Sequence, residues 1–283
     1  MAVLKTHLKI SFFLSLTYFW LGFVEAQILK QSCINEACSA KRVTISNPPI
    51  NLWDANVITA FNEFMISLQD QNETKVVVFD SDNSDFWASS LDINLLTQLG
   101  ISGRNIIFIG EINGRAWGAG DEHLLRMDMR FAGPEAQFGA PEAAIGVIHV
   151  GGLQQLVKLI GPGRAAEYML AATQVSASEA ARVGWVNSVH PTANALRKHV
   201  NAIAARIALF PIETLRATKA SIAEQAPPRA AFENDLARFN QLAALPQVAA
   251  NVGTVLQVSK NESKTFEENL NNNIVKKLYQ VPK

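Results

Sequence analysis

Residues 113–122 read N-G-R-A-W-G-A-G-D-E and come shortly after the apolar run 106–109, which has the composition of a buried strand. The small residues 118–120 predict a tight turn, and a helix over 123–129 or a shorter stretch is expected after it. Such a turn exposes backbone N–H groups that can hold an oxygen gaining negative charge, whereas larger side chains would block that oxygen. A plain strand-to-helix turn, in which the glycines only allow close packing, is the alternative.

Other glycine-containing sites do not fit this stretch. A dinucleotide-binding fingerprint that starts at Gly118 needs a glycine where His123 stands, and a phosphate-binding loop needs Gly-Lys-Ser/Thr. The nucleophile elbow G-x-S-x-G fails as well, because residues 100–103 place the second glycine one position early. Glu122 beside His123 does not form the zinc motif H-E-x-x-H, so we expect no metal at this turn.

A second acidic residue, Glu142, ends the stretch Q-F-G-A-P-E at 137–142, after a possible strand over 127–132. Two carboxyl groups that meet in an apolar pocket can differ in protonation, so that one donates a proton and the other accepts one. Glu122 and Glu142 are therefore candidates for acid–base catalysis. Two solvated glutamates without a shared role are the open alternative.

The composition argues against a nucleic-acid partner. The chain has 283 residues, of which 48% are hydrophobic and 18% are charged, as is ordinary for a globular protein. Its 25 basic residues equal its 25 acidic residues, so there is no net basic field to bind a phosphate backbone.

Residues 1–26 have the pattern of a secretory signal peptide. Lys5 and Lys9 precede or border the apolar run 10–24, and small or aliphatic residues stand near a cleavage point after Ala26. A membrane anchor is the first alternative, although the run is shorter than the roughly 18 residues that an anchor usually needs. A misassigned first exon is the second.

The two cysteines, Cys33 and Cys38, follow this segment and could form a disulfide in an oxidising compartment. They do not predict a metal site, because without a nearby histidine a tetrahedral ion would be half-ligated. Glycosylation sequons begin at Asn72 and Asn261. These features favour a secreted glycoprotein or one of the secretory pathway, with a cytoplasmic or membrane-anchored protein as the alternative.

Alternating strand and helix patterns predict an α/β fold. Asp54 can cap the first helix, and Ser176 with Glu179 forms a capping-box pattern before a short helix that Gly184 can end. The polar residues 261–283 predict a loose tail or a docking arm. Strands are expected at 41–46, 76–79 and 106–109, and helices at 55–68, 152–160, 164–172, 192–209 and over most of 230–256.

Six stretches occur along the chain in a specific order and spacing. They are V-T-I-S-N-P-P-I-N-L at 43–52, V-V-V-F-D-S at 76–81, W-A-S-S-L-D-I at 87–93, N-G-R-A-W-G-A-G-D-E at 113–122, F-G-A-P-E at 138–142 and A-S-E-A-A-R-V-G-W-V-N at 177–187. As a set they resemble the crotonase superfamily of enoyl-CoA hydratases and isomerases. The similarity extends over roughly residues 41–225.

The resemblance implies an acyl-CoA thioester as the substrate, with coenzyme A as part of that substrate and no separate cofactor. It implies that two backbone N–H groups, those of Leu91 and Ala119, hold the thioester oxygen as an enolate forms. Glu122 would activate the water that attacks the β-carbon, and Glu142 would supply the proton at the α-carbon.

The chain departs from the family pattern in two places. Ser89 and Ser90 replace the family's Ala-Gly, and together with Asp92 they are the expected substrate-binding residues. The loop 146–152 reads G-V-I-H-V-G-G where the family has G-x-x-P-G-x-G-G, so His149 stands in place of proline. This loop should hold the catalytic water, so the change affects hydration more than enolate formation. His149 is either an extra polar group of the site or a structural histidine.

Because both glutamates are present, the expected reaction is the hydration of trans-2-enoyl-CoA. A double-bond isomerase, which can work with one glutamate, is the first alternative, and a non-catalytic binding protein of the same fold is the second. Fatty-acid breakdown and secondary metabolism are equally compatible with the sequence.

The resemblance also implies the fold, a crotonase-like spiral of ββα units in two roughly perpendicular sheets with a helical C-terminal region. The expected organisation is a signal peptide at 1–26, a crotonase core at 27–210, a helical oligomerisation region at 211–260 and a polar tail at 261–283. A homotrimer or a hexamer is the expected assembly.

Overall fold

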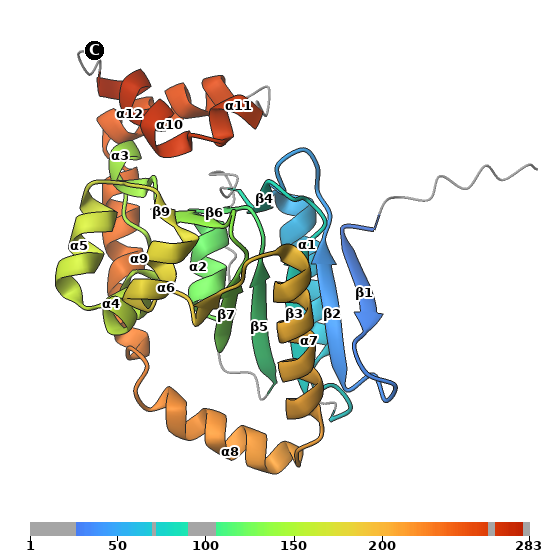
Figure 1. Cartoon of the computed structure of the whole chain (residues 1–283). Coiled ribbons are helices and arrows are strands. Elements are labelled where there is room, and N and C mark those ends of the chain that lie inside the picture. Colours follow the sequence, from blue (N-terminus) through green and yellow to red (C-terminus); the bar gives the residue numbers. More distant parts are fainter. Residues whose placement is uncertain (1–26, 70–71, 90–105, 260–263, 280–283) are drawn as a thin grey trace, which may run out of the picture.

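The computed structural model describes residues 27–69, 72–89, 106–259 and 264–279, which form two β-sheets with helices packed around them (Figure 1). The predicted signal peptide lies outside the described residues, as do Ser90, Leu91 and Asp92. Within the described ranges, no helix has both the length and the apolar character that crossing a membrane requires.

The larger sheet has six strands in the order β1-β2-β3-β5-β7-β10. β1 and β2 are antiparallel, and the other neighbouring strands are parallel. Val77 and Phe79 of β3 face one apolar cluster while Val76 and Val78 face another, so both faces are covered, which explains the continuous apolar runs. The strands are β1 (Leu29–Cys33), β2 (Ala40–Ile45), β3 (Val76–Ser81), β5 (Ile107–Ile112), β7 (Met129–Ala132) and β10 (Ser188–Val189).

The smaller sheet has four strands in the order β4-β6-β8-β9. β4, β6 and β8 each follow a strand of the larger sheet along the chain, and β6 and β8 are each followed by a helix. This repeat of two strands and a helix confirms the two-sheet spiral expected from the sequence. The strands are β4 (Phe86–Ala88), β6 (Arg115–Trp117), β8 (Gln137–Gly139) and β9 (Val175–Ser176).

Most helix ends agree with the capping signals in the sequence. Asp54 accepts hydrogen bonds from the first turn of α1, Ser176 caps α6 by accepting the N–H of Glu179, and Gly184 ends α6 with φ of 92°. These helices and their neighbours are α1 (Ala55–Ser67), α3 (Glu142–Ile145), α4 (Leu153–Ile160), α5 (Pro162–Leu170), α6 (Ala177–Val183) and α7 (Ala193–Ala208).

The helix after the 113–122 stretch differs from the expectation. It is α2 (Ala119–Leu125), so the predicted start at 123 is four residues late. Gly118 has φ of 47°, a conformation that lets the chain turn from β6 into the helix at once. Asp121 and Glu122 therefore lie in the first helical turn.

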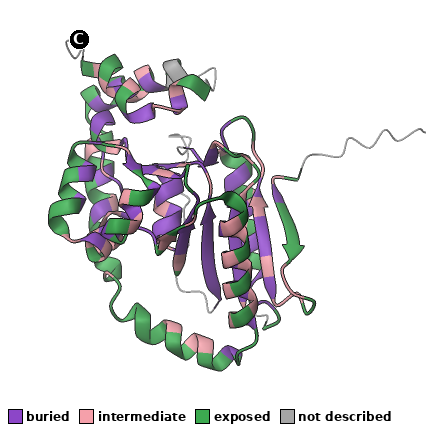
Figure 2. Ribbon diagram, viewed as in Figure 1, coloured by how far each residue is buried: buried purple, intermediate pink, exposed green. Residues whose placement is uncertain are grey.

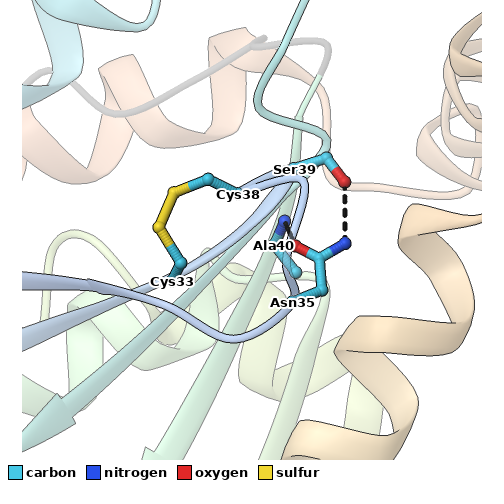
Figure 3. Close-up of a disulfide and its surroundings, with 5 residues drawn as sticks. All are labelled: Cys33, Asn35, Cys38, Ser39 and Ala40. Carbon is cyan, nitrogen blue, oxygen red and sulfur yellow. Dashed lines mark hydrogen bonds between the residues drawn. A yellow bond between two sulfur atoms is a disulfide. The ribbon is translucent and has the colours of Figure 1, made fainter.

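The β1–β2 connection is closed by a disulfide between Cys33 and Cys38 (Figure 3). Inside this connection, the side chain of Asn35 donates to Ser39 Oγ at 2.9 Å and accepts the N–H of Ala40 at 3.0 Å. The pairing is the one that the sequence allowed for an oxidising compartment.

The C-terminal part is helical. α8 (Ile212–Ala223) extends away from both sheets (Figure 1) and is mostly exposed or half-buried (Figure 2), with Ile212 as its buried residue. The remaining helices are α9 (Arg229–Ala243), α10 (Pro246–Ser259), α11 (Lys264–Glu267) and α12 (Leu270–Tyr279).

The segment after 260 is not a loose tail over its described residues, because α12 docks on α3. Leu270 and Ile274 are buried in one apolar cluster with Ala144 and Ile145 of α3. The hydroxyl of Tyr279 also donates to the carbonyl of Ala144 at 2.9 Å. Apolar residues at helical spacing within a polar, Asn-rich stretch explain why docking prevails.

Replacing Ile274, which is 1% exposed, with alanine should lower the free energy of unfolding by about 2–4 kcal/mol, because it leaves a cavity between α12 and α3. Urea denaturation followed by circular dichroism measures this. Lys276→Ala on the exposed side of α12 is the matched control and should change stability by less than about 0.5 kcal/mol. Equal stability of the two variants would contradict the docking of α12.

Candidate active site

The two predicted glutamates lie after neighbouring strands. Glu122 is in α2, which follows β6, and Glu142 is the first residue of α3, which follows β8. β6 and β8 pair in parallel, so their carboxyl ends and the helices that follow lie at the same edge of the smaller sheet. Glu122, Glu142 and His149 can each present an atom such that the three atoms lie within 4.8 Å of one another.

Two glycines make room for these carboxylates. A Cβ at Gly118 would lie 2.7 Å from Glu142 Oε1, and a Cβ at Gly151 would lie 2.7 Å from Glu122 Oε2. A side chain at either position would force the carboxylate to move, and at Gly118 the φ of 47° also favours glycine. Arg126 also reaches this loop, because its Nε donates to the carbonyl of Gly151 at 3.1 Å.

His149 lies between the acidic groups. Its Nδ1 is 3.4 Å from Glu122 Oε1 and 3.6 Å from Glu142 Oε1, and its Nε2 is 3.3 Å from Asp121 Oδ2. The other oxygen of Asp121 accepts a hydrogen bond from Trp185 Nε1 at 2.9 Å. The sequence left open whether His149 belongs to the site, and the structure places it there. Asp121, which had no role in the sequence analysis, is its second partner.

The charges of this cluster depend on one another. Burial raises the pKa of Asp121 and that of Glu122, and the positive charge of His149 only partly offsets the effect. Burial lowers the pKa of His149, but the negative charges of Glu142, Asp121 and Glu122 outweigh it and hold the pKa well above 6.5. The cluster therefore favours the protonated imidazole, and burial makes Asp121 and Glu122 bind protons more strongly than exposed carboxyls do.

Ala119 is the first residue of α2, where backbone N–H groups have no partner within the helix. Its carbonyl lies 2.8 Å from Nδ1 of His123, a buried histidine stacked on Trp53 with a ring-centroid distance of 3.8 Å. Burial lowers the pKa of His123 to about 3, so this ring is neutral and can donate its N–H to Ala119. The peptide group that follows Ala119 is thus held in a fixed direction.

The end of β4 packs directly against the start of α2. A Cβ at Gly120 would lie 2.6 Å from the carbonyl oxygen of Ala88, so only glycine allows this approach. The next residue, Ser89, is fully buried, and its N–H donates to the carbonyl of Asn51 at 3.2 Å. The predicted site residues Ser90, Leu91 and Asp92 lie outside the described ranges.

A pocket of about 280 Å³ adjoins Glu142 and His149. Apart from these two residues and Gln154, its walls are aliphatic, which suits an apolar group that ends near the carboxylates. The wall residues come from β8–α3, the 146–152 loop, α4 and α5, and include Ala143, Val147, Leu153, Val157, Ala165 and Met169.

The same cluster has donor atoms for a cation, since Glu122, Glu142 and His149 each offer one ligand atom. A metal needs a neutral imidazole, however, and the raised pKa of His149 favours the protonated ring. A metal ion would therefore have to compete with a proton for His149.

Sequence reasoning predicted Glu122, Glu142 and Ala119 as site residues, and the structure brings the two glutamates together. It did not predict that Asp121 contacts Trp185 and His149. Trp185 lies in the stretch V-G-W-V-N, which contributed to the resemblance without any assigned role. The only local sequence signal for a role of Asp121 was its position next to Glu122. Side chains of adjacent residues in a helix point in different directions.

The sequence model of the enoyl-CoA hydratase/isomerase family matches residues 95–243 of this chain. Among curated proteins, the peroxisomal fatty acid beta-oxidation multifunctional protein AIM1 of Arabidopsis thaliana is 28% identical over 174 residues, which are 54% of this chain and 24% of that protein. The carnitinyl-CoA dehydratase of Salmonella agona is 29% identical over 164 residues, 52% of this chain and 63% of that protein. The chain thus matches less than two thirds of the length of these relatives.

Among solved structures, a candidate enoyl-CoA hydratase from Streptomyces avermitilis superposes with a TM-score of 0.80 and 30% identity, covering 88% of this chain and 96% of the other. DspI of Pseudomonas aeruginosa gives a TM-score of 0.63 and 25% identity, with coverage of 80% and 99%. The two-sheet spiral is therefore shared along nearly the whole of these proteins.

The glycine at 118 offers a test of the site geometry. Gly118→Ala forces a side chain into φ of 47° and against Glu142, so we expect a loss of about 1–3 kcal/mol in the free energy of unfolding. Gly163→Ala is the control, because a Cβ there meets nothing within 4 Å, and it should leave stability unchanged or raise it by up to about 1 kcal/mol. Urea unfolding of both variants decides the matter, and a neutral Gly118→Ala would mean that Glu142 does not approach this turn.

Proposed function

The chain belongs to the enoyl-CoA hydratase/isomerase family, and we propose that it acts on an acyl-CoA thioester by stabilising an enolate and moving protons with Glu122 and Glu142. The observation that carries the proposal is the convergence of both carboxylates at one edge of the smaller sheet, beside the start of α2 and an apolar pocket. Acid–base groups, backbone donors and space for an acyl group thus occur together.

The proposed reaction is the hydration of trans-2-enoyl-CoA. The N–H of Ala119, together with that of Leu91 as the resemblance implies, would donate to the thioester oxygen while negative charge develops on it. Glu122 would take a proton from water as the hydroxyl adds to the β-carbon, and Glu142 would give a proton to the α-carbon. The raised pKa of Glu122 supports this role, because it makes the ionised carboxylate a stronger base.

A second candidate is double-bond isomerisation, and the position of His149 favours it. Nδ1 of His149 lies 3.4 Å and 3.6 Å from the two glutamate oxygens, in the space between them that a shared water would otherwise use. An isomerase needs no water, because one glutamate removes a proton from one carbon and returns it to another. The family name covers both reactions, so the choice between them rests on the experiment below.

The acyl chain would enter the aliphatic pocket beside Glu142. A volume of about 280 Å³ is at the small end for a ligand site and favours short or medium chains. The names of the relatives make fatty-acid breakdown the first pathway to test, because AIM1 is named for peroxisomal fatty acid beta-oxidation.

We extend the proposal to assembly and location. Leu209, Phe210 and Ile222 expose apolar surface at the end of α7 and along α8, which supports a homo-oligomer such as a trimer or hexamer. The Cys33–Cys38 disulfide supports passage through an oxidising compartment. An acyl-CoA is not an expected substrate in such a compartment. If the enzyme proposal fails, a non-catalytic binding protein of the same fold is the alternative.

Glu142→Gln should lower kcat/KM for a trans-2-enoyl-CoA by about a hundredfold or more, because the group that exchanges the α-proton is lost. Glu122→Gln should abolish hydration but spare isomerisation. The loss of absorbance of the conjugated thioester measures hydration, and product analysis detects the moved double bond. Glu135→Gln, an exposed glutamate before β8, is the matched control and should retain full activity.

The outcome that would end the enzyme proposal is the absence of turnover at every chain length while coenzyme A thioesters still bind. Retained hydration in Glu122→Gln would instead move the role of base to another group of the site.

Ala143→Leu should narrow the aliphatic pocket and shift chain-length preference. Each methylene that can no longer be buried costs about 0.8 kcal/mol, or roughly fourfold in kcat/KM, so longer enoyl-CoAs should lose much more than the four-carbon substrate. Ala171→Leu is the control, because that exposed residue lies outside the pocket wall. An equal effect on all chain lengths would show that the acyl chain lies elsewhere.

A further inference from the structure

Three carboxyl groups meet around one imidazole in this site. Asp121 and Glu122 come from α2, Glu142 comes from α3, and each has an oxygen within 3.6 Å of a ring nitrogen of His149. Nε2 faces only Asp121, whereas Nδ1 faces both glutamates. Nδ1 thus lies within 3.6 Å of the two groups to which the proposed reaction assigns proton transfer, although neither ring nitrogen makes a hydrogen bond of good geometry in this structure.

Asp121 lies next to the ring of His149, 3.3 Å from its Nε2. Its side chain is fully buried, and its second oxygen is occupied by the indole N–H of Trp185. The charge of buried Arg130 also acts on Asp121, but the N–H groups of Arg130 donate to the carbonyls of Trp185, Leu124 and Met127. The structure thus gives Asp121 two partners. Trp185 holds the carboxylate in place, and the carboxylate orients the ring of His149.

The charges around the cluster make the histidine necessary. If all three carboxyls ionise, they place three negative charges around a ring with one positive charge, within a few ångströms and mostly out of water. The other positive group that acts on Glu122 is Arg126, and its Nε donates to Gly151. Without a charged ring, less positive charge would offset the repulsion between Glu122 and Glu142.

We propose that His149, oriented by Asp121, is a positioning residue that holds the carboxyl groups of Glu122 and Glu142 together and sets the pH range in which they can exchange protons. The inference deepens the proposed function and rests on it for its effect on turnover. The charge state of His149 itself, however, can be measured without any substrate.

The sign of the pH effect follows from the raised pKa of His149. The ring is charged below that pKa and loses its charge as the pH rises through it, so activity and this part of the stability fall on the basic side. Asp121→Asn removes one negative neighbour but keeps an oxygen to accept the N–H of Trp185. The pKa of His149 should therefore fall, and the basic limb of the activity profile should move to lower pH.

The first measurement is a pH titration of the histidine ring nitrogens by NMR in the ¹⁵N-labelled full chain. In the unsubstituted protein, His149 should be protonated at both nitrogens at pH 7, and Asp121→Asn should lower its pKa by about one unit or more. His190→Gln, which removes a histidine outside the cluster, serves as the control and should leave the His149 titration unchanged. A neutral His149 at pH 7, or a titration that ignores Asp121→Asn, would overturn the inference even if the enzyme is active.

The second measurement is the pH dependence of kcat and KM. Asp121→Asn should shift the basic limb of kcat by the same amount as the NMR titration, with little change in KM at low pH. His149→Gln should lower kcat at least tenfold and abolish that limb. If His149→Gln fails to fold, Asp121→Asn and Trp185→Phe test the same effect on the basic limb of kcat, with a smaller expected change. If Asp121→Asn is active but the basic limb of its kcat profile is unshifted, the positioning role is refuted. If the protein is inactive but the NMR titration shifts as expected, only the proposed function is refuted.

Discussion

The backbone hydrogen bond from Gly118 to the carbonyl of Gly139, at 3.0 Å, is the contact on which the site depends. It extends the pairing of β6 with β8 to the point where the chain turns into α2 and approaches α3. Both residues are glycine, and Gly118 also needs φ of 47° to make the turn. Two glutamates from successive units of the spiral meet because this pairing persists to the last residue of each strand.

The parts of the site differ in how far the sequence could predict them. Glu122 and Glu142 lie in local motifs with a fixed spacing to their strands, so pattern and resemblance sufficed. The contact of Asp121 with His149 joins α2 to a loop beyond α3, and that with Trp185 joins it to the chain after α6. Periodicity carries no information on such pairs, because they depend on how distant elements pack.

One local expectation failed, and another was decided between its two alternatives, for similar reasons. The late start expected for α2 came from treating 118–120 as a loop, whereas the positive φ of Gly118 completes the turn in one residue. The segment after 260 is polar enough to remain solvated, yet Leu270 and Ile274 find an apolar partner surface on α3. In both cases tertiary packing decided what composition left open.

The docking of α12 has a consequence for how the molecule should respond to heat. α3, which carries Glu142, is only four residues long and is held from outside by one of the last helices of the chain. A helix this short has little stability of its own and depends on that cover. Fraying at the C-terminus would therefore release Glu142 while both sheets are still intact, so thermal inactivation should precede melting of the fold.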